Sequence, residues 1–245
     1  MKKFVLILGL MAILSNICYA SNEFSMSGDE LDYDMESSLG IARGNVILKH
    51  DGGIVTGDYA QFNNKEYKGY MSGNVVAEKD GYRITSDAMT LYDKDHVSAN
   101  GNAVIKHEGR VLRAPIIDYF KNRQFLETNN GRAVLVDVDG SILQADKINY
   151  DHIAGVANAD GNVKIQSDIR NLTASADKAI YRINSNSIGN YLELIGNAIA
   201  TQDGNTVRGN RLKLNNARVA QMDGGVSIDF IPKAKNLSDN KKQIS

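Results

Sequence analysis

The 245-residue sequence contains one cysteine, two prolines and no tryptophan. Its only cysteine, Cys18, lies in an N-terminal leader, so we expect no disulfide and no thiol chemistry in the rest of the chain. The chain also lacks an excess of charge of either sign, because 28 basic residues are balanced by 29 acidic ones. A nearly neutral chain has no electrostatic footprint for nucleic acid, and we expect no nucleic-acid partner.

Long hydrophobic runs are also lacking, apart from one of 11 residues between Phe4 and Leu14. This run is too short to cross a bilayer, which takes roughly 20 residues. Lys2 and Lys3 precede the run and the small residues Cys18 and Ala20 follow it, as in a secretory signal peptide. We predict a signal peptide over residues 1–20, cleaved after Ala20; a retained anchor and a lipoprotein signal at Cys18 are the alternatives.

Helical periodicity is absent too, since no long segment carries apolar residues at three- and four-residue spacing. The 22 glycines would weaken any helix. Val, Ile, Tyr, Asn and Asp are abundant instead, a composition that favours strands joined by turns.

A Gly-Asn-Val tripeptide, or a close relative of it, recurs along the whole chain at intervals of 28 to 35 residues. Such a period indicates a repeat architecture built from one small unit. The copies begin at Gly44, Gly73, Gly101, Gly131, Gly161, Gly196 and Gly224.

A second element lies between successive copies: an aspartate followed by apolar residues two and four positions later. It occurs at Asp58, Asp87, Asp146 and Asp177, with a half unit at Asp29, Asn210 in a weaker copy and Pro115 in place of one aspartate. A residue that recurs in each repeat favours a structural role over catalysis, and we expect these carboxylates to bond backbone N–H groups at a bend.

Between the two elements, most units carry an Asp-Gly or Glu-Gly pair, such as Asp80-Gly81, Glu108-Gly109, Asp139-Gly140 and Asp203-Gly204. Such pairs suit two-residue hairpin turns, so each unit is predicted to be an antiparallel hairpin. Two strands per unit give about fourteen or fifteen strands in all.

Alternation along the strands predicts one dry and one wet face. The third and fifth positions of every copy are apolar, whereas Gln61, Thr90, Asp118 and Asn149 occupy the other face of the second strands. We expect the hairpins to stack into two inward-facing sheets around a long apolar interior, open at both ends. The exposed terminal strands would then recruit another chain.

Catalytic and metal-binding patterns are not found. The four histidines lie in separate units without metal-ligand spacing and are expected to be solvated beside turns. No nucleophile elbow or phosphate-binding loop is present either. We expect neither an enzyme nor a protein that needs a cofactor.

The segments "GNVILKHDGGIVTGDYAQF", "GNVVAEKDGYRITSDAMTLY" and "GNVKIQ…ASADKAIY" resemble the OstA-like units of periplasmic lipopolysaccharide-transport proteins, over nearly all of residues 24–231. This resemblance implies an all-β, elongated, open-ended antiparallel β-jellyroll built from repeated hairpins. It also implies a periplasmic protein that binds lipopolysaccharide through the acyl chains of lipid A. The soluble, LptA-like member of the family bridges the inner and outer membranes.

The partners that the resemblance implies are an inner-membrane-anchored component of similar fold, the periplasmic domain of the outer-membrane translocon, and further copies of the chain joined end to end. The domain is predicted to span residues 21–232, followed by a flexible polar tail over 233–245. A membrane-associated sister component of the same system, a secreted polysaccharide-acting β-solenoid enzyme and an adhesin-like scaffold with a packed core are the alternative functions.

From the resemblance and the inward positions together, candidate lipid-binding residues can be named. Those near the ends of the series are favoured, because the centre must stay packed. The candidates are Phe24, Met26, Leu31, Tyr33, Val46, Leu48, Phe62, Met71, Val75, Leu91, Ile105, Tyr119, Leu135, Tyr150, Ile165 and Tyr181.

Overall fold

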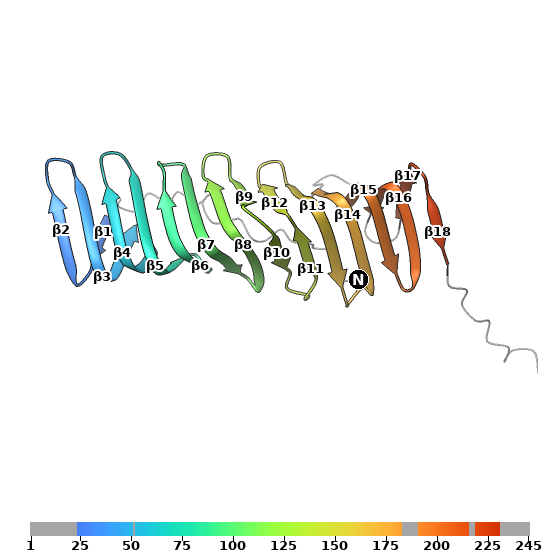
Figure 1. Ribbon diagram of the computed structural model, residues 1–245, viewed down its shortest axis with the longest axis horizontal. Coiled ribbons are helices and arrows are strands. Elements are labelled where there is room, and N and C mark those ends of the chain that lie inside the picture. Colours follow the sequence, from blue (N-terminus) through green and yellow to red (C-terminus); the bar gives the residue numbers. More distant parts are fainter. Residues whose placement is uncertain (1–23, 51, 183–190, 216–218, 231–245) are drawn as a thin grey trace, which may run out of the picture.

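The computed structural model describes residues 24–50, 52–182, 191–215 and 219–230, which form one elongated antiparallel sheet (Figure 1). The predicted signal peptide and the predicted tail lie outside these residues. Within them all regular structure is β, as the repeats predict. The 18 strands are β1 (Phe24–Ser27), β2 (Glu30–Asp34), β3 (Leu39–His50), β4 (Gly53–Asn63), β5 (Lys68–Lys79), β6 (Tyr82–Leu91), β7 (His96–His107), β8 (Arg110–Phe120), β9 (Phe125–Asn129), β10 (Ala133–Val136), β11 (Ile142–Ala145), β12 (Lys147–Asp151), β13 (Val156–Ser167), β14 (Leu172–Arg182), β15 (Tyr191–Gln202), β16 (Asn205–Asn215), β17 (Val219–Asp223) and β18 (Ser227–Asp229).

Successive strands pair with one another along the chain, which gives the ribbon its length. β1 and β2 both pair with β3, and β17 and β18 both pair with β16. Each of these pairs is therefore one long strand broken into two, as are β9 with β10 and β11 with β12. Once the broken strands are taken as single ones, the total agrees with the number that the repeats predict.

The Asp-Gly turns are confirmed at three positions. Asp80 and Gly81 have φ angles of 48° and 79°, and Glu108-Gly109 and Asp203-Gly204 share this conformation. The positive φ of both residues is that of a type I′ turn. The prediction of a two-residue turn is wrong at Asp139-Gly140. Only Gly140 has a positive φ there, and its N–H donates to the Asp137 carbonyl.

The Gly-Asn pairs lie at a bend in the middle of the strands. Gly44 and Asn45 of β3 have φ angles of 68° and 46°, and together they face the single residue Asp58 of β4. Two residues opposite one form a β-bulge, which bends the strand. The same bulge recurs at Gly73, Gly101, Gly161 and Gly196, so every strand contributes one half to each of two layers.

The repeated aspartates meet these bulges on the neighbouring strand. Carboxylate oxygens accept hydrogen bonds from asparagine side chains in Asn45–Asp29, Asn102–Asp87, Asn162–Asp146 and Asn197–Asp177, at 2.7–3.0 Å. The predicted site at a bend is confirmed, but the expected partner was wrong. The donor in these pairs is the side-chain amide of the asparagine that follows the glycine, rather than a backbone N–H.

The glycine of each bulge leaves room for an aspartate of the neighbouring strand. Adding a methyl group at this glycine tests how much the close approach contributes to stability. A Cβ atom on Gly73 would lie 2.2 Å from Oδ2 of Asp58, at a φ of 84°. Gly73→Ala is therefore expected to lower the free energy of unfolding by about 2–3 kcal/mol in urea denaturation. Gly140→Ala is the control, because φ is 79° there but no atom lies within 4 Å, and we expect about 1 kcal/mol. Equal losses would show that the close approach of Asp58 does not contribute to the free energy of unfolding.

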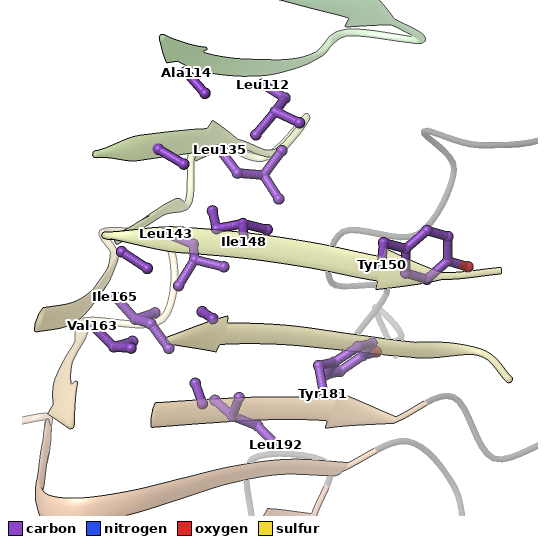
Figure 2. Packing of buried hydrophobic residues seen from close by; sticks show 14 of the residues in the cluster. Leu112, Ala114, Leu135, Leu143, Ile148, Tyr150, Val163, Ile165, Tyr181 and Leu192 are labelled. Carbon is purple, nitrogen blue, oxygen red and sulfur yellow. The ribbon is translucent and has the colours of Figure 1, made fainter. Parts of the chain in front are cut away.

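The apolar positions face inward between the two layers, as predicted. Val46, Val75, Ala103, Ala133, Val163 and Ala198, at the third position of the copies, are each at most 1% exposed. Figure 2 shows how the buried side chains of β8 and of β10–β15 follow one another along the sheet. The exceptions are Val226 and Ile228, 43% and 40% exposed, which belong to the last copy, at the C-terminal end of the sheet.

Candidate functional site

The space between the layers is the candidate site, and it holds two groups of buried side chains. The larger group, here called the central cluster, runs from Tyr82 to Leu212 and includes Leu112, Leu135 and Leu194. The smaller one, the N-terminal cluster, consists of Ala42, Val46, Ala60, Met71 and Val75. Met89 packs against both of them.

The candidate residues differ in how far they are covered. Those that are buried are Val46, Met71, Val75, Ile105, Leu135, Tyr150, Ile165 and Tyr181. Those that are half-buried are Phe24, Met26, Leu48, Phe62, Leu91 and Tyr119. Leu31 and Tyr33 of β2 are 52% and 57% exposed. They lie on the inner face, because Leu31 pairs directly with the buried Ala42, but β2 is at the end of the sheet.

The central cluster is closed in this structure. The cavity inside it has a volume of about 30 Å³ and is lined by residues of both layers, among them Ser141, Leu143, Ile148 and Tyr181. A space of this size holds about one water molecule and no acyl chain. Burial, together with the charge of Asp151, raises the pKa of the Tyr150 phenol to about 12. The long apolar interior is therefore filled by side chains at its centre and has no room there for an acyl chain.

A row of polar side chains lies along one rim of the interior, where the sequence predicted an apolar face. Arg110 and Asp137 are paired directly across β8 and the end of β10, with Nε 2.9 Å from Oδ1, and are 7% and 3% exposed. Next to them, the Ser141 and Ser167 hydroxyls are 2.7 Å apart, and both accept hydrogen bonds from Arg170.

The strand alternation in the sequence contains a signal for this row, although no motif marks it. Arg110 stands two residues before the inward Leu112, and Asp137 two residues after the inward Leu135. Ser141 and Ser167 hold the same relation to Leu143 and Ile165. Residues two apart in a strand share a face, so continuing the count by one step in each direction predicts the polar row.

At the N-terminal end the two layers touch through side chains of β1. The rings of Phe24 on β1 and Phe62 on β4 are stacked with their centroids 4.4 Å apart. Met26 of β1 lies over Gly40 of β3, where a Cβ atom would be 2.6 Å from its Cε. Leu31 and Tyr33 extend the apolar inner face beyond this contact into solvent.

The C-terminal end of the interior is also uncovered. Val226, Ile228 and Phe230 are 43%, 40% and 72% exposed. Ile228 pairs directly with Val207, which packs against the central cluster, so this end continues the inner face. Among the described residues, the two ends of the apolar interior thus both reach solvent.

The outer face carries most of the polar chemistry. His96 Nε2 lies 2.9 Å from Asp118 Oδ1, and the His96 ring stacks on Phe120 at 4.3 Å. Burial acts to raise the pKa of Asp118, but hydrogen bonds from His96, Asn129 and Ser98 outweigh it and leave this pKa below its ordinary value. The expectation of solvated histidines is wrong for His96 and for His107, because aromatic neighbours cover both rings. Unlike His96, His107 lies on the inner side, where it pairs with Arg110 and stacks on Tyr82 at 3.4 Å.

A shallow hollow of about 310 Å³ lies over β11 and β13–β15, with Gln144, Lys164, Gln166 and Thr201 in its lining. No group of three or more His, Cys, Asp or Glu residues in the described ranges is placed to hold a metal ion. The same residues include no helix with the length and apolarity that a membrane span requires.

Comparison with known proteins identifies the family. The model of the family described as LptA/(LptD N-terminal domain) LPS transport protein matches residues 54–218, more than half of the chain. No curated protein matches the sequence. The crystal structure of LptH, the LptA homologous periplasmic component of the conserved lipopolysaccharide transport device from Pseudomonas aeruginosa, is similar over 86% of this chain and 96% of that one, with 10% identity and a TM-score of 0.18.

A TM-score this low carries no argument, so the assignment rests on the family model. That model spans the region from β4 to β16, in which the Gly-Asn bulges and their aspartates form the repeated ladder. This matched region contains repeated hairpins, bent strands and much of the apolar space between the two layers. The chain belongs to the LptA/(LptD N-terminal domain) family of LPS transport proteins.

Proposed function

We propose that this protein carries lipopolysaccharide through the periplasm between the inner and outer membranes, without catalysing a reaction. The acyl chains of lipid A would lie between the two layers, and several copies would join end to end into a bridge. The proposal includes export by the signal peptide over residues 1–20, a single domain over 21–232 and a polar tail over 233–245. The observation that carries it is the apolar inner face that reaches solvent at both ends of a chain of this family.

Shielding acyl chains is the physical task of such a carrier. At about 0.8 kcal/mol per methylene, a chain of roughly twelve carbons loses about 10 kcal/mol on entering water, and lipid A has several such chains. The apolar inner face that is exposed at the ends of the sheet would reduce this penalty during the transfer. The side chains at the N-terminal end that would contact the lipid are Phe62, Met71 and Leu48.

The ends of the sheet also support the proposed partners. β1 and β2 at one end and β17 and β18 at the other are edge strands, and edge strands add further strands from other chains. We infer that one end receives the inner-membrane-anchored component and the other the periplasmic domain of the outer-membrane translocon, with further copies of this chain between them.

A structural scaffold with a packed core is the second candidate, and the closed central cluster favours it. Photo-crosslinking separates the two functions. A photoreactive residue at Phe62 or Met71, in protein purified from a lipopolysaccharide-producing host, is expected to capture lipid A in mass spectrometry. The matched control is Gln61, the exposed neighbour of Phe62 on the outer face of β4, which should stay unlabelled. Labelling at Gln61 with silence at Phe62 and Met71 would reject the interior as the site.

A further inference from the structure

Side chains of the protein itself fill the N-terminal end of the interior. Phe24 and Met26 alternate with Ser25 and Ser27 along β1, and only the first two face inward. Phe24 crosses the space between the layers to stack on Phe62, and Met26 crosses it to reach Gly40. The route from the N-terminal cluster to solvent is therefore occupied by two apolar side chains of one short strand.

Glycines on the inner face provide the room that these side chains take. Gly40, Gly57 and Gly69 all point inward, and Cβ atoms there would lie 2.6 Å from Met26, 2.8 Å from Met71 and 3.0 Å from Phe62. None of the three has a positive φ, so the backbone does not require glycine at these positions. The next inward residue beyond Gly69 in the same row is Leu91. The N-terminal end thus combines inner positions that carry no side chain with methionines, whose flexible side chains adapt to different neighbours.

β1 is held more weakly than the strands around it. It has four residues, from Phe24 to Ser27, and its pairing in the described chain is with β3 alone. By contrast, β4 and β5 each pair on both sides over eight or more residues, β4 with β3 and β5, and β5 with β4 and β6. Short edge strands open at a lower free energy than the body of a sheet.

From this geometry we propose that β1 is an internal plug: Phe24 and Met26 hold the place of an acyl chain and leave it when the acyl chain of a lipopolysaccharide-type amphiphile enters. This inference rests on the proposed function. The sequence predicted that Phe24 and Met26 contact the bound lipid. In this proposal they instead compete with the lipid for the same space. A site that is open for only part of the time binds with an apparent dissociation constant raised by the inverse of the open fraction.

Locking the plug in place tests the proposal. Ser25 and Lys49 are direct cross-strand partners, both exposed on the outer face, and Cys18 is the only native cysteine. In the mature protein, the double variant Ser25→Cys/Lys49→Cys is expected, once oxidised, to bind purified lipopolysaccharide and fluorescently labelled dodecanoic acid at least about tenfold more weakly than after reduction. Unchanged binding in the oxidised form would overturn the plug.

Removing the plug should have the opposite effect. Phe24→Ala/Met26→Ala is expected to bind both probes at least about tenfold more tightly than the wild type, whereas the control Ser25→Ala/Ser27→Ala, on the exposed face of β1, binds like the wild type. Weaker or unchanged binding by the first variant would show that Phe24 and Met26 line the site or take no part in it. Failure of every form, including the reduced one, to bind either probe would refute the proposed function itself.

Discussion

Replacing Asp137 with alanine is expected to lower the free energy of unfolding by roughly 3–5 kcal/mol, because it leaves the guanidinium of Arg110 buried without its main partner. Counting side-chain atoms alone, Asp137 is 1% exposed and Arg110 is 8% exposed, and Arg110 Nε lies 2.9 Å from Asp137 Oδ1. A buried charge that loses its partner keeps the full cost of leaving water. Urea denaturation monitored by circular dichroism measures the loss.

The control for this prediction is an ion pair at the surface. Asp32→Ala also deletes one carboxylate that pairs with an arginine at 2.8 Å, but the side chains of Arg43 and Asp32 are 46% and 72% exposed. We expect a much smaller loss, because exposed ion pairs contribute little to stability. The apolar double variant Arg110→Met/Asp137→Leu should regain most of the stability, since it removes both charges. Similar losses in Asp137→Ala and Asp32→Ala would mean that the polar row is not shielded from water.

Leu194→Ala is expected to cost about 3 kcal/mol of unfolding free energy. Leu194 is 0% exposed in the central cluster, so its truncation loses the burial of the side chain and leaves a cavity. Leu31→Ala deletes the same atoms from a residue that is 52% exposed, and should cost less than about 1 kcal/mol. Urea denaturation with an unchanged m-value would assign both effects to the folded state.

The comparison of Leu194 with Leu31 bears on how the proposed carrier would work. If the two losses were equal, the centre would be as loosely packed as the end, and a ligand would pass along the whole interior without rearrangement. The expected difference places the rigid part of the protein at the centre and the adaptable part at the end, where glycines and methionines face inward. Movement of an acyl chain past the centre would then require the layers to separate.

The sequence predicted the sheet more fully than it predicted the site. The 28- to 35-residue period, the Asp-Gly turns and the alternation of Val46, Val75 and Val163 with outward residues predicted strands, their number and their inner face. These features are local, since a strand alternates and a turn forms from residues adjacent in the chain. The family resemblance follows from the same repeated residues.

Contacts between distant residues were not visible. The sequence placed a glycine-asparagine pair and an aspartate in most units, but their meeting at a bulge depends on strands pairing side by side. The burial of Arg110 with Asp137, 27 residues apart, depends on β8 lying beside β10. Counting along each strand places Arg110 and Asp137 on the inner face, but it does not show that these two residues meet.

The sequence by itself determined that this chain forms repeated antiparallel strands with one apolar side, because side-chain alternation and turn chemistry act over a few residues. Only the tertiary structure decided where the apolar space is open and where it is filled. That outcome depends on how far the two layers approach each other and on which side chains cross between them, as Phe24 and Met26 do at one end and the central cluster does in the middle.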